Sequence, residues 1–185
     1  MSYVGEDNFS RKEVFMKLNS FEDLFVCLLS DMRNFELEIV KDIPLMIKRA
    51  HSDELKEALR NHLVETKDQV KRLDKVFKMI KREPCNVEWT SDVKNLFADA
   101  GTFLQENIPS PLLDAALITI AQRIEHFEIA TYGTLMEFAD VLELDEVKDI
   151  LKETIKEEGH ADKLLTKLAK GGIFSKGINL EATHI

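Results

Sequence analysis

A stripe of apolar side chains with one acid in its middle runs through residues 147–168. Its members are spaced alternately four and three residues apart: Val147, Leu151, Thr154, Glu158, Ala161, Leu165 and Leu168. Side chains at these steps share one face of an α-helix, so this face is expected to pack against a core. A buried carboxylate costs several kcal/mol unless it is paired, protonated or bound to a cation. Glu158 is therefore a candidate for a functional role.

The same helical periodicity predicts three further long helices. They are expected over about residues 20–50, from Ser52 to about residue 81, and from Ser110 to the turn near Glu143, with the last helix ending at Gly171. Ser52 and Ser110 are the predicted N-caps, and Pro111 is a favourable first helical residue after Ser110. Pro44 lies inside the first helix, where it should bend the helix or leave one carbonyl without its amide partner.

The order of these helices predicts an all-α fold. Two helical hairpins are joined by a long crossover, in which residues 91–106 carry a short helical pattern. This order is typical of a ferritin-like four-helix bundle, in which one long connection links two antiparallel pairs. We therefore expect an N-terminal extension (1–19), the ferritin-like bundle with its short extra helix (20–170) and a C-terminal tail without periodicity (171–185).

The composition and charge of the chain limit which partners it can bind and in which cellular compartment it is expected. The net charge of −9, without a basic cluster, disfavours binding to nucleic acid. No apolar run approaches the roughly 20 residues of a membrane-spanning helix, and the N-terminus lacks the apolar centre of a signal peptide. Cys27 and Cys85 form no CxxC pair, so both are expected to be reduced thiols in a cytoplasmic protein.

Acidic side chains recur on the inward faces of all four predicted helices. Glu36, Glu65, Glu128 and Glu158 lie on or beside the apolar stripes, and Glu125 and Asp162 lie one helical turn from two of them. Helix geometry adds His62 and Gln69 to the strip that holds Glu65. Oxygen ligands from several helices suit iron or manganese rather than thiolate chemistry. These residues therefore predict a carboxylate-bridged dinuclear metal site.

The ligand set on the fourth helix has two interpretations. The di-iron template pairs a Glu with a His three residues later, which selects Glu157 and His160. Helical geometry instead places His160 toward the flank and favours Glu158 with Asp162, so His160 remains a secondary candidate together with Gln69 and His62.

Structural alternatives remain open for the same residues. The central acids could pair with Arg123 or Tyr132, and Glu36 and Glu65 could reach solvent at an interface. His62 and His126 would then be ordinary helix histidines with satisfied hydrogen bonds.

Several strings of residues resemble one known family. They are Phe21–Phe25, His62–Thr66, Glu125–Leu135 and Lys152–Asp162, and the third is the most specific. Together they are similar to the YciE/YciF-like bacterial stress proteins, a ferritin-like group. The resemblance implies a rubrerythrin-like bundle, a homodimer and a dinuclear metal site. It carries the family's inward acids onto Glu36, Glu65, Glu125, Glu128, Glu158 and Asp162.

The expected function follows from the acids and the resemblance together. We predict a stress-related protein whose dinuclear iron or manganese site handles O2 or a peroxide. The alternative is a non-catalytic helical bundle that keeps the fold without a functional metal site. Neither the residues nor the resemblance decides whether the protein is an enzyme, and no catalytic residue is assigned.

Overall fold

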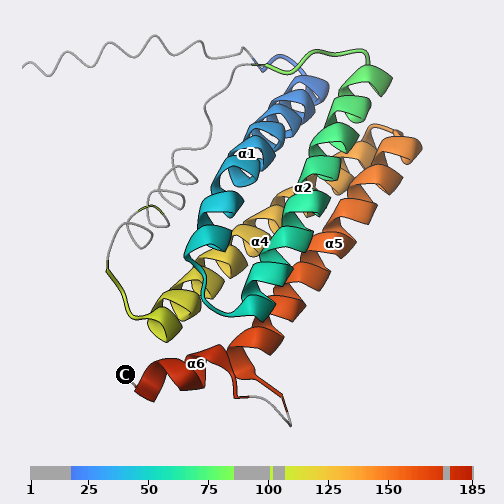
Figure 1. Ribbon diagram of the computed structural model, residues 1–185. Helices are drawn as coiled ribbons and strands as arrows, with labels where there is room; N and C mark the ends of the chain where they lie inside the picture. The colour runs from blue at the N-terminus through green and yellow to red at the C-terminus, as the bar shows by residue number, and fades with distance from the viewer. Residues whose placement is uncertain (1–17, 86–100, 102–106, 173–175, 185) are drawn as a thin grey trace, which may run out of the picture.

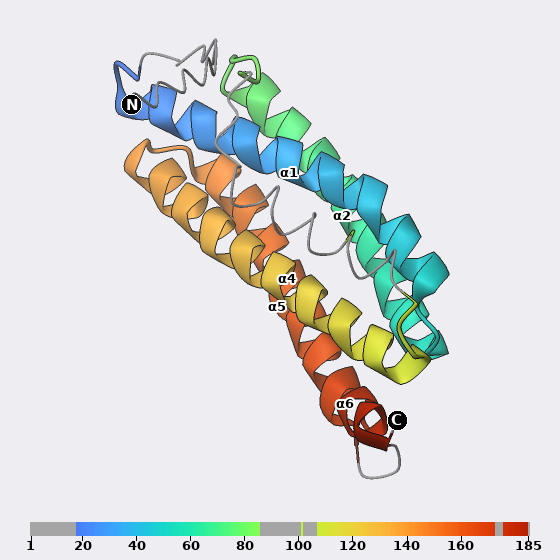
Figure 2. The same cartoon turned by 90° about the vertical axis from the view of Figure 1, so that its left-hand side faces the viewer.

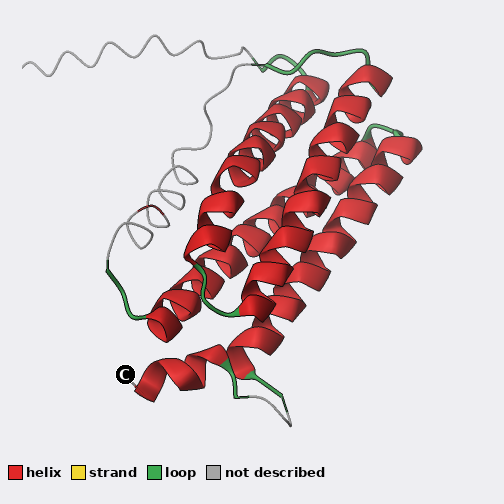
Figure 3. Ribbon diagram, viewed as in Figure 1, coloured by secondary structure: helices red, strands yellow, loops and turns green. Residues whose placement is uncertain are grey.

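The protein folds into a bundle of four long antiparallel helices. The computed structural model describes residues 18–85, 101, 107–172 and 176–184. The long helices are α1 (Phe21–Arg49), α2 (Asp53–Met79), α4 (Ser110–Val141) and α5 (Asp145–Lys170) (Figure 1). Within the described part of the chain, the secondary structure is helical except for one isolated bridge between Gly171 and Lys176 (Figure 3). The predicted all-α class is confirmed.

The helices pair as two hairpins. α1 packs most extensively on α2, and α4 on α5, while contacts of α2 with α5 and of α1 with α4 join the pairs (Figures 1 and 2). A long crossover connects α2 to α4, which is the predicted ferritin-like topology. Of the helix predicted over residues 91–106, only Gly101 lies among the described residues.

The helix ends follow the capping signals with one exception. The Ser20 and Ser52 hydroxyls accept hydrogen bonds from the backbone N–H groups of Asp23 and Leu55, so each serine caps its helix. The prediction that Ser110 caps α4 is wrong by one residue. Pro109 is the N-cap, because its extended backbone places its carbonyl 3.0 Å from the N–H of Leu113.

Pro44 does not interrupt α1, which continues to Arg49. Its side chain is exposed, so the pyrrolidine ring points away from the core. Since proline has no N–H, the carbonyl of Val40 has no helical partner. This is the second of the two predicted effects of Pro44, an unpartnered carbonyl instead of a bend.

A buried acid far from the candidate site joins the two hairpins. The carboxylate of Asp114 on α4 is 3% exposed and accepts hydrogen bonds from the backbone N–H groups of His51 and Ser52, at 2.8 and 2.7 Å. These groups belong to the loop between α1 and α2, where N–H groups at a helix start lack helical partners. Both carboxylate oxygens of Asp114 thus accept hydrogen bonds, and its role is structural.

The C-terminal segment forms a short helix against the bundle. α6 (Ile178–Glu181) and the 3₁₀ turn η1 (Ala182–His184) pack at the end of the bundle where α4 begins and α5 ends (Figure 2). Ile178 is buried there. At Gly177 a Cβ atom would lie 2.2 Å from the carbonyl carbon of Lys170, so only glycine allows this close approach. A helix this short has too few residues for a periodic signal, which is why the sequence shows none here.

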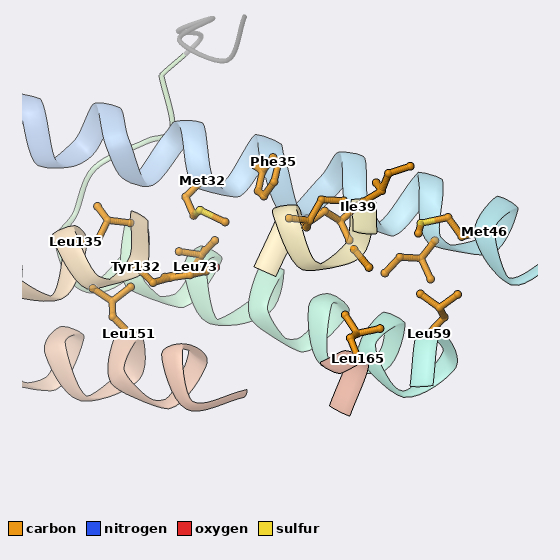
Figure 4. Packing of buried hydrophobic residues seen from close by; sticks show 14 of the residues in the cluster. Met32, Phe35, Ile39, Met46, Leu59, Leu73, Tyr132, Leu135, Leu151 and Leu165 are labelled. Atoms are coloured by element: carbon orange, nitrogen blue, oxygen red, sulfur yellow. The ribbon is translucent and has the colours of Figure 1, made fainter. Parts of the chain in front are cut away.

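The bundle core has a polar layer between two apolar ones. On α5 the buried Glu158 lies between Leu151 and Leu165, and on α2 the buried Gln69 lies between Leu59 and Leu73. Figure 4 shows Leu73, Leu135 and Leu151 at one end of the core, and Leu59 and Leu165 at the other. No helix among the described residues combines the length and apolar character needed to cross a membrane.

Candidate metal centre

Four side chains from three helices meet in the polar layer. His62 on α2, Glu125 and Glu128 on α4, and Glu158 on α5 each place one nitrogen or oxygen atom within 4.8 Å of the others. All four side chains are buried, with Glu128 and Glu158 at 0% exposure. Glu125 and Glu128 both point inward because residues three apart share a helix face.

Most polar atoms of this cluster lack a hydrogen-bond partner within the described chain. The unpartnered atoms include both oxygens of Glu128, one oxygen each of Glu125 and Glu158, and both ring nitrogens of His62. Buried polar groups are nearly always hydrogen-bonded. This number of unpartnered atoms at one point therefore requires an explanation. Their oxygen and imidazole chemistry fits a hard or borderline divalent cation.

Glu36 on α1 extends the cluster toward the first hairpin. Its carboxylate is fully buried, and Oε1 accepts a hydrogen bond from the hydroxyl of Tyr132 on α4. Its second oxygen, Oε2, has no partner among the described residues. The charge of Glu158 raises the pKa of Glu36, and the charges of Glu158 and Glu36 raise that of Glu128. Glu36 is thus part of the same electrostatic unit.

Burial raises the pKa of every acid in the cluster, and repulsion among these acids adds to the shifts of Glu36, Glu125 and Glu128. Burial, followed by the charge of Glu158, raises the pKa of Glu36 to about 8 and that of Glu128 well above its ordinary value. The pKa of Glu125 rises to about 11, mainly through burial. Burial also raises the pKa of Glu158 to about 7. Without a cation, the carboxyl groups of Glu36 and Glu125 favour their protonated forms at neutral pH.

His62 presents a neutral imidazole to the acids. Burial lowers its pKa to about 4, so the ring carries no charge at neutral pH. Its Nε2 lies 3.3 Å from Oε1 of Glu125, without the alignment of a hydrogen bond. A neutral imidazole is the form that binds metal ions.

A hydrogen-bonded network behind the cluster positions Glu158. The amide nitrogen of Gln69 on α2 donates to Oε1 of Glu158 and, at 3.0 Å, to Oε2 of Glu157. The guanidinium of Arg72 binds both oxygens of Glu157, which neutralises that acid. Such partners of ligand carboxylates fix their orientation. The network thus links α2 to α5 beside the site.

The structure brings only some of the sequence-predicted residues together. Glu36, Glu125, Glu128 and Glu158 meet as expected from their inward faces, and the secondary candidate His62 joins them. Gln69 also lies at the site, but it directs its amide nitrogen at Glu158 and therefore acts as a donor rather than a ligand.

Asp162, Glu65 and His160 lie outside the cluster. Asp162 accepts a hydrogen bond from Gln122 at 3.0 Å and lies 3.4 Å from Nε2 of His126, so the expected partnership with Glu158 is absent. The reason is geometric: a residue one turn further along α5 is displaced along the axis and faces α4. Glu65 is half-buried and His160 is exposed.

A cavity connects the cluster with the surface between α2 and α5. It has a volume of about 350 Å³, and His62 and Glu125 form part of its wall. Glu65 and His160 line the same cavity further out, together with apolar side chains that include Leu59 and Leu164. The cavity offers small molecules or ions a path to the buried ligands.

Sequence reasoning did not identify the pair of Arg72 and Glu157. Its signal was present, because Arg72 lies one turn after Gln69 on α2 and Glu157 adjoins Glu158. The relative rotation of α2 and α5, which decides whether the two meet, is set by tertiary packing. For the same reason the sequence supports His62 only as a secondary candidate, although it lies in the inward stripe of α2.

Comparisons with known proteins agree with this architecture. A family model described as a domain of unknown function (DUF892) matches residues 20–178. The chain belongs to this family. Protein YciF of Escherichia coli strain K12 is 33% identical over 169 residues, which cover 89% of this chain and 99% of that protein. The predicted resemblance is therefore confirmed.

Solved structures of relatives share the fold. The crystal structure of the E. coli stress protein YciF matches with a TM-score of 0.77 and 32% identity, covering 81% of this chain and 94% of that one. YcfI from Rhodopseudomonas palustris matches with a TM-score of 0.77 and 35% identity, covering 87% and 99% of the two chains. The family and fold are thus established together, whereas the chemistry of the site rests on its geometry.

Proposed function

We propose that the protein is a stress-related, ferritin-like metalloprotein with a carboxylate-bridged dinuclear iron or manganese site. The observation that carries this proposal is the group of unpartnered buried atoms on His62, Glu125, Glu128 and Glu158. A cation would complete the coordination of these atoms and offset the repulsion that raises the pKa values of the acids.

The proposed ligands are Glu36, His62, Glu125, Glu128 and Glu158. A single cluster of four groups suits one ion, and Glu36 with the second carboxylate oxygens supplies donors for another. Carboxylates that bridge two ions are the usual design in ferritin-like bundles. Bound as a pair, iron or manganese ions supply redox electrons for the reduction of O2 or a peroxide.

Other residues of the chain would orient the metal ligands, shield them from solvent and line the path by which small molecules reach them. Gln69 holds Glu158, and Tyr132 holds Glu36, so two ligands on different helices are oriented before a cation binds. The apolar layers above and below shield the acids from solvent except along the cavity that reaches Glu125. We assign Glu65 and His160 to the access path, because both line the cavity that reaches His62 and Glu125. The homodimer and the cytoplasmic location remain predictions.

The stoichiometry of metal binding tests the proposal directly. Metal-free protein titrated with Mn(II), or with Fe(II) without oxygen, should take up two ions per chain, measured by elemental analysis after desalting. A ligand that binds only the folded state at 100 times its Kd stabilises by roughly 2.7 kcal/mol, so the melting temperature should rise by roughly 5–10 °C. Fewer than one ion per two chains would contradict the proposal, and one ion per chain would restrict it to a mononuclear site.

A second prediction tests the role of Gln69. Gln69→Met keeps the length of the side chain but removes the donor to Glu158, so metal affinity should fall by roughly 10–100-fold. The measurement is a metal-binding titration by calorimetry. Lys67→Met on the exposed face of α2 is the matched control and should bind as the wild type does. Equal affinity in the two variants would mean that Gln69 does not position the ligand.

The alternative function is a metal-free structural bundle, and one observation favours it. The acids have raised pKa values and hydrogen bonds from Tyr132 and Gln69, so protonated acids could satisfy part of the core themselves. This alternative predicts a melting temperature that added metal leaves unchanged, so the titration above separates the two functions.

A further inference from the structure

The protein's two cysteines lie side by side at the end of the bundle opposite α6. Cys27 is in α1, and Cys85 follows the end of α2, yet their sulfur atoms are only 3.8 Å apart. Both are thiols here. A disulfide has an S–S distance of about 2.05 Å, so closure requires the sulfurs to approach by roughly 1.8 Å. We propose that Cys27 and Cys85 form a reversible disulfide when the protein meets a peroxide.

Ser30 holds Cys85 in position for this reaction. The buried Ser30 hydroxyl donates to the carbonyl of Val26 at 2.6 Å and accepts the backbone N–H of Cys85 at 3.0 Å. The Cys85 sulfur also lies 3.2 Å from the same hydroxyl. A non-helical residue is thereby tied to α1 one turn from Cys27. These hydrogen bonds to Ser30 hold the Cys85 sulfur close to the Cys27 sulfur.

The two thiols differ in a way that assigns their roles. Cys27 is 1% exposed, whereas Cys85 is half-buried and accessible to a small oxidant. Burial raises the pKa of Cys27 to about 12, so this thiol keeps its proton. Cys85 is therefore the sulfur that meets the peroxide, and Cys27 is the resolving thiol.

The reaction balances with hydrogen peroxide as the oxidant. The thiolate of Cys85 attacks one peroxide oxygen, the O–O bond breaks, and Cys85 becomes a sulfenic acid. The other oxygen leaves as hydroxide and takes up the proton that the Cys85 thiol had released, which gives water. The sulfur of Cys27 then attacks the sulfenic sulfur, the S–S bond forms, and the S–O bond breaks. The hydroxyl takes the proton of Cys27 and leaves as a second water. Two electrons from the two sulfurs reduce one peroxide.

The bond would lock the first hairpin. It closes a loop that contains α1 from Cys27 onward and all of α2, and it ties the beginning of the crossover to the bundle. Cross-linking residues this far apart restricts the unfolded chain, which should raise the melting temperature by roughly 10 °C. The inference does not depend on the metal site, because neither cysteine belongs to it.

Thiol counting and mass spectrometry test the inference. Full-length protein is treated with equimolar hydrogen peroxide in the presence of a chelator, so that the metal site takes no part. We expect both thiols to disappear, the intact monomer to lose two hydrogen masses, a peptide to link Cys27 to Cys85, and dithiothreitol to reverse all three changes. Retained thiols, disulfide-linked dimers or added oxygen without a cross-link would overturn the proposal.

Single substitutions of the two cysteines and of Ser30 test which sulfur reacts first. Cys27→Ser should accumulate a sulfenic acid at Cys85 that dimedone traps, whereas Cys85→Ser should react at least tenfold more slowly because Cys27 is buried. Ser30→Ala should slow formation of the disulfide without changing the thiol count of the reduced protein. If Cys85→Ser reacts as fast as Cys27→Ser, the assigned order is wrong. The wild-type experiment stands even if a variant fails to fold.

Discussion

Replacing Glu128 by glutamine is expected to weaken metal binding by at least about 100-fold, the largest single effect in the molecule. Both oxygens of Glu128 are buried and have no hydrogen-bond partner among the described residues, and the charges of Glu36, Glu125 and Glu158 all act on this residue. Glutamine keeps the shape but supplies one weaker oxygen ligand and no charge. Since loss of a residue that merely orients a ligand costs 10–100-fold in affinity, removal of the ligand itself should cost at least that much. Calorimetric titration with Mn(II) measures the change.

The control for this variant separates metal binding from folding. Glu137→Gln changes an exposed acid on the same helix and should bind metal like the wild type. Burial raises the pKa of the Glu128 carboxyl well above its ordinary value, which favours the neutral form in the metal-free protein. Glutamine then replaces one neutral group by another, and the unfolding free energy should change by less than about 1 kcal/mol. A stable Glu128→Gln protein with unchanged affinity would place the metal elsewhere or nowhere.

The metal-free protein is expected to lose stability as the pH rises from 6.5 to 9. The acids of the cluster have folded-state pKa values raised above the unfolded value, to about 7 for Glu158 and about 8 for Glu36. A raised acid holds its proton longer in the folded state, so its stabilising effect is complete below the unfolded pKa and disappears as the pH passes the folded pKa. Summed over the cluster, the loss should be on the order of 5 kcal/mol.

The choice of pH window matters because His62 acts in the opposite direction. Its folded pKa is lowered to about 4, so between that pH and the unfolded value of 6.5 it makes the protein more stable as the pH rises. Above about pH 7.5 His62 is neutral in both states, so it no longer offsets the effect of the acids. Melting temperatures measured in a chelator should fall by on the order of 10 °C across this window.

Metal should reverse this trend. Cations bind the deprotonated carboxylates, so their affinity rises with pH, and saturating Mn(II) should remove most of the decline. Glu128→Gln removes one of the raised acids and should show a shallower decline in chelator than the wild type. A melting temperature that is flat or rising from pH 6.5 to 9 in chelator would show that the acids of the cluster do not have raised pKa values in the folded protein.

Much of the fold could be predicted from the sequence because the signals are local. The apolar stripes lie in α1, α2, α4 and α5, and the serine caps and Gly171 mark most of their ends. The inward acids followed from the same geometry, since a helix face is determined by residue spacing. The tail helix could not be predicted, because its packing on α4 and α5 provides the stability that four residues lack.

The sequence by itself therefore determined that acids lie inside a two-hairpin helical bundle, and that Glu36, Glu125, Glu128 and Glu158 face its interior. Only the tertiary structure decided that His62 joins them and that Asp162 turns to Gln122 and His126. It also brought Cys85 to Cys27. The physical reason is that spacing determines the direction of a side chain about its own helix axis. The rotation and depth of that helix against its neighbours depend on packing across the whole core.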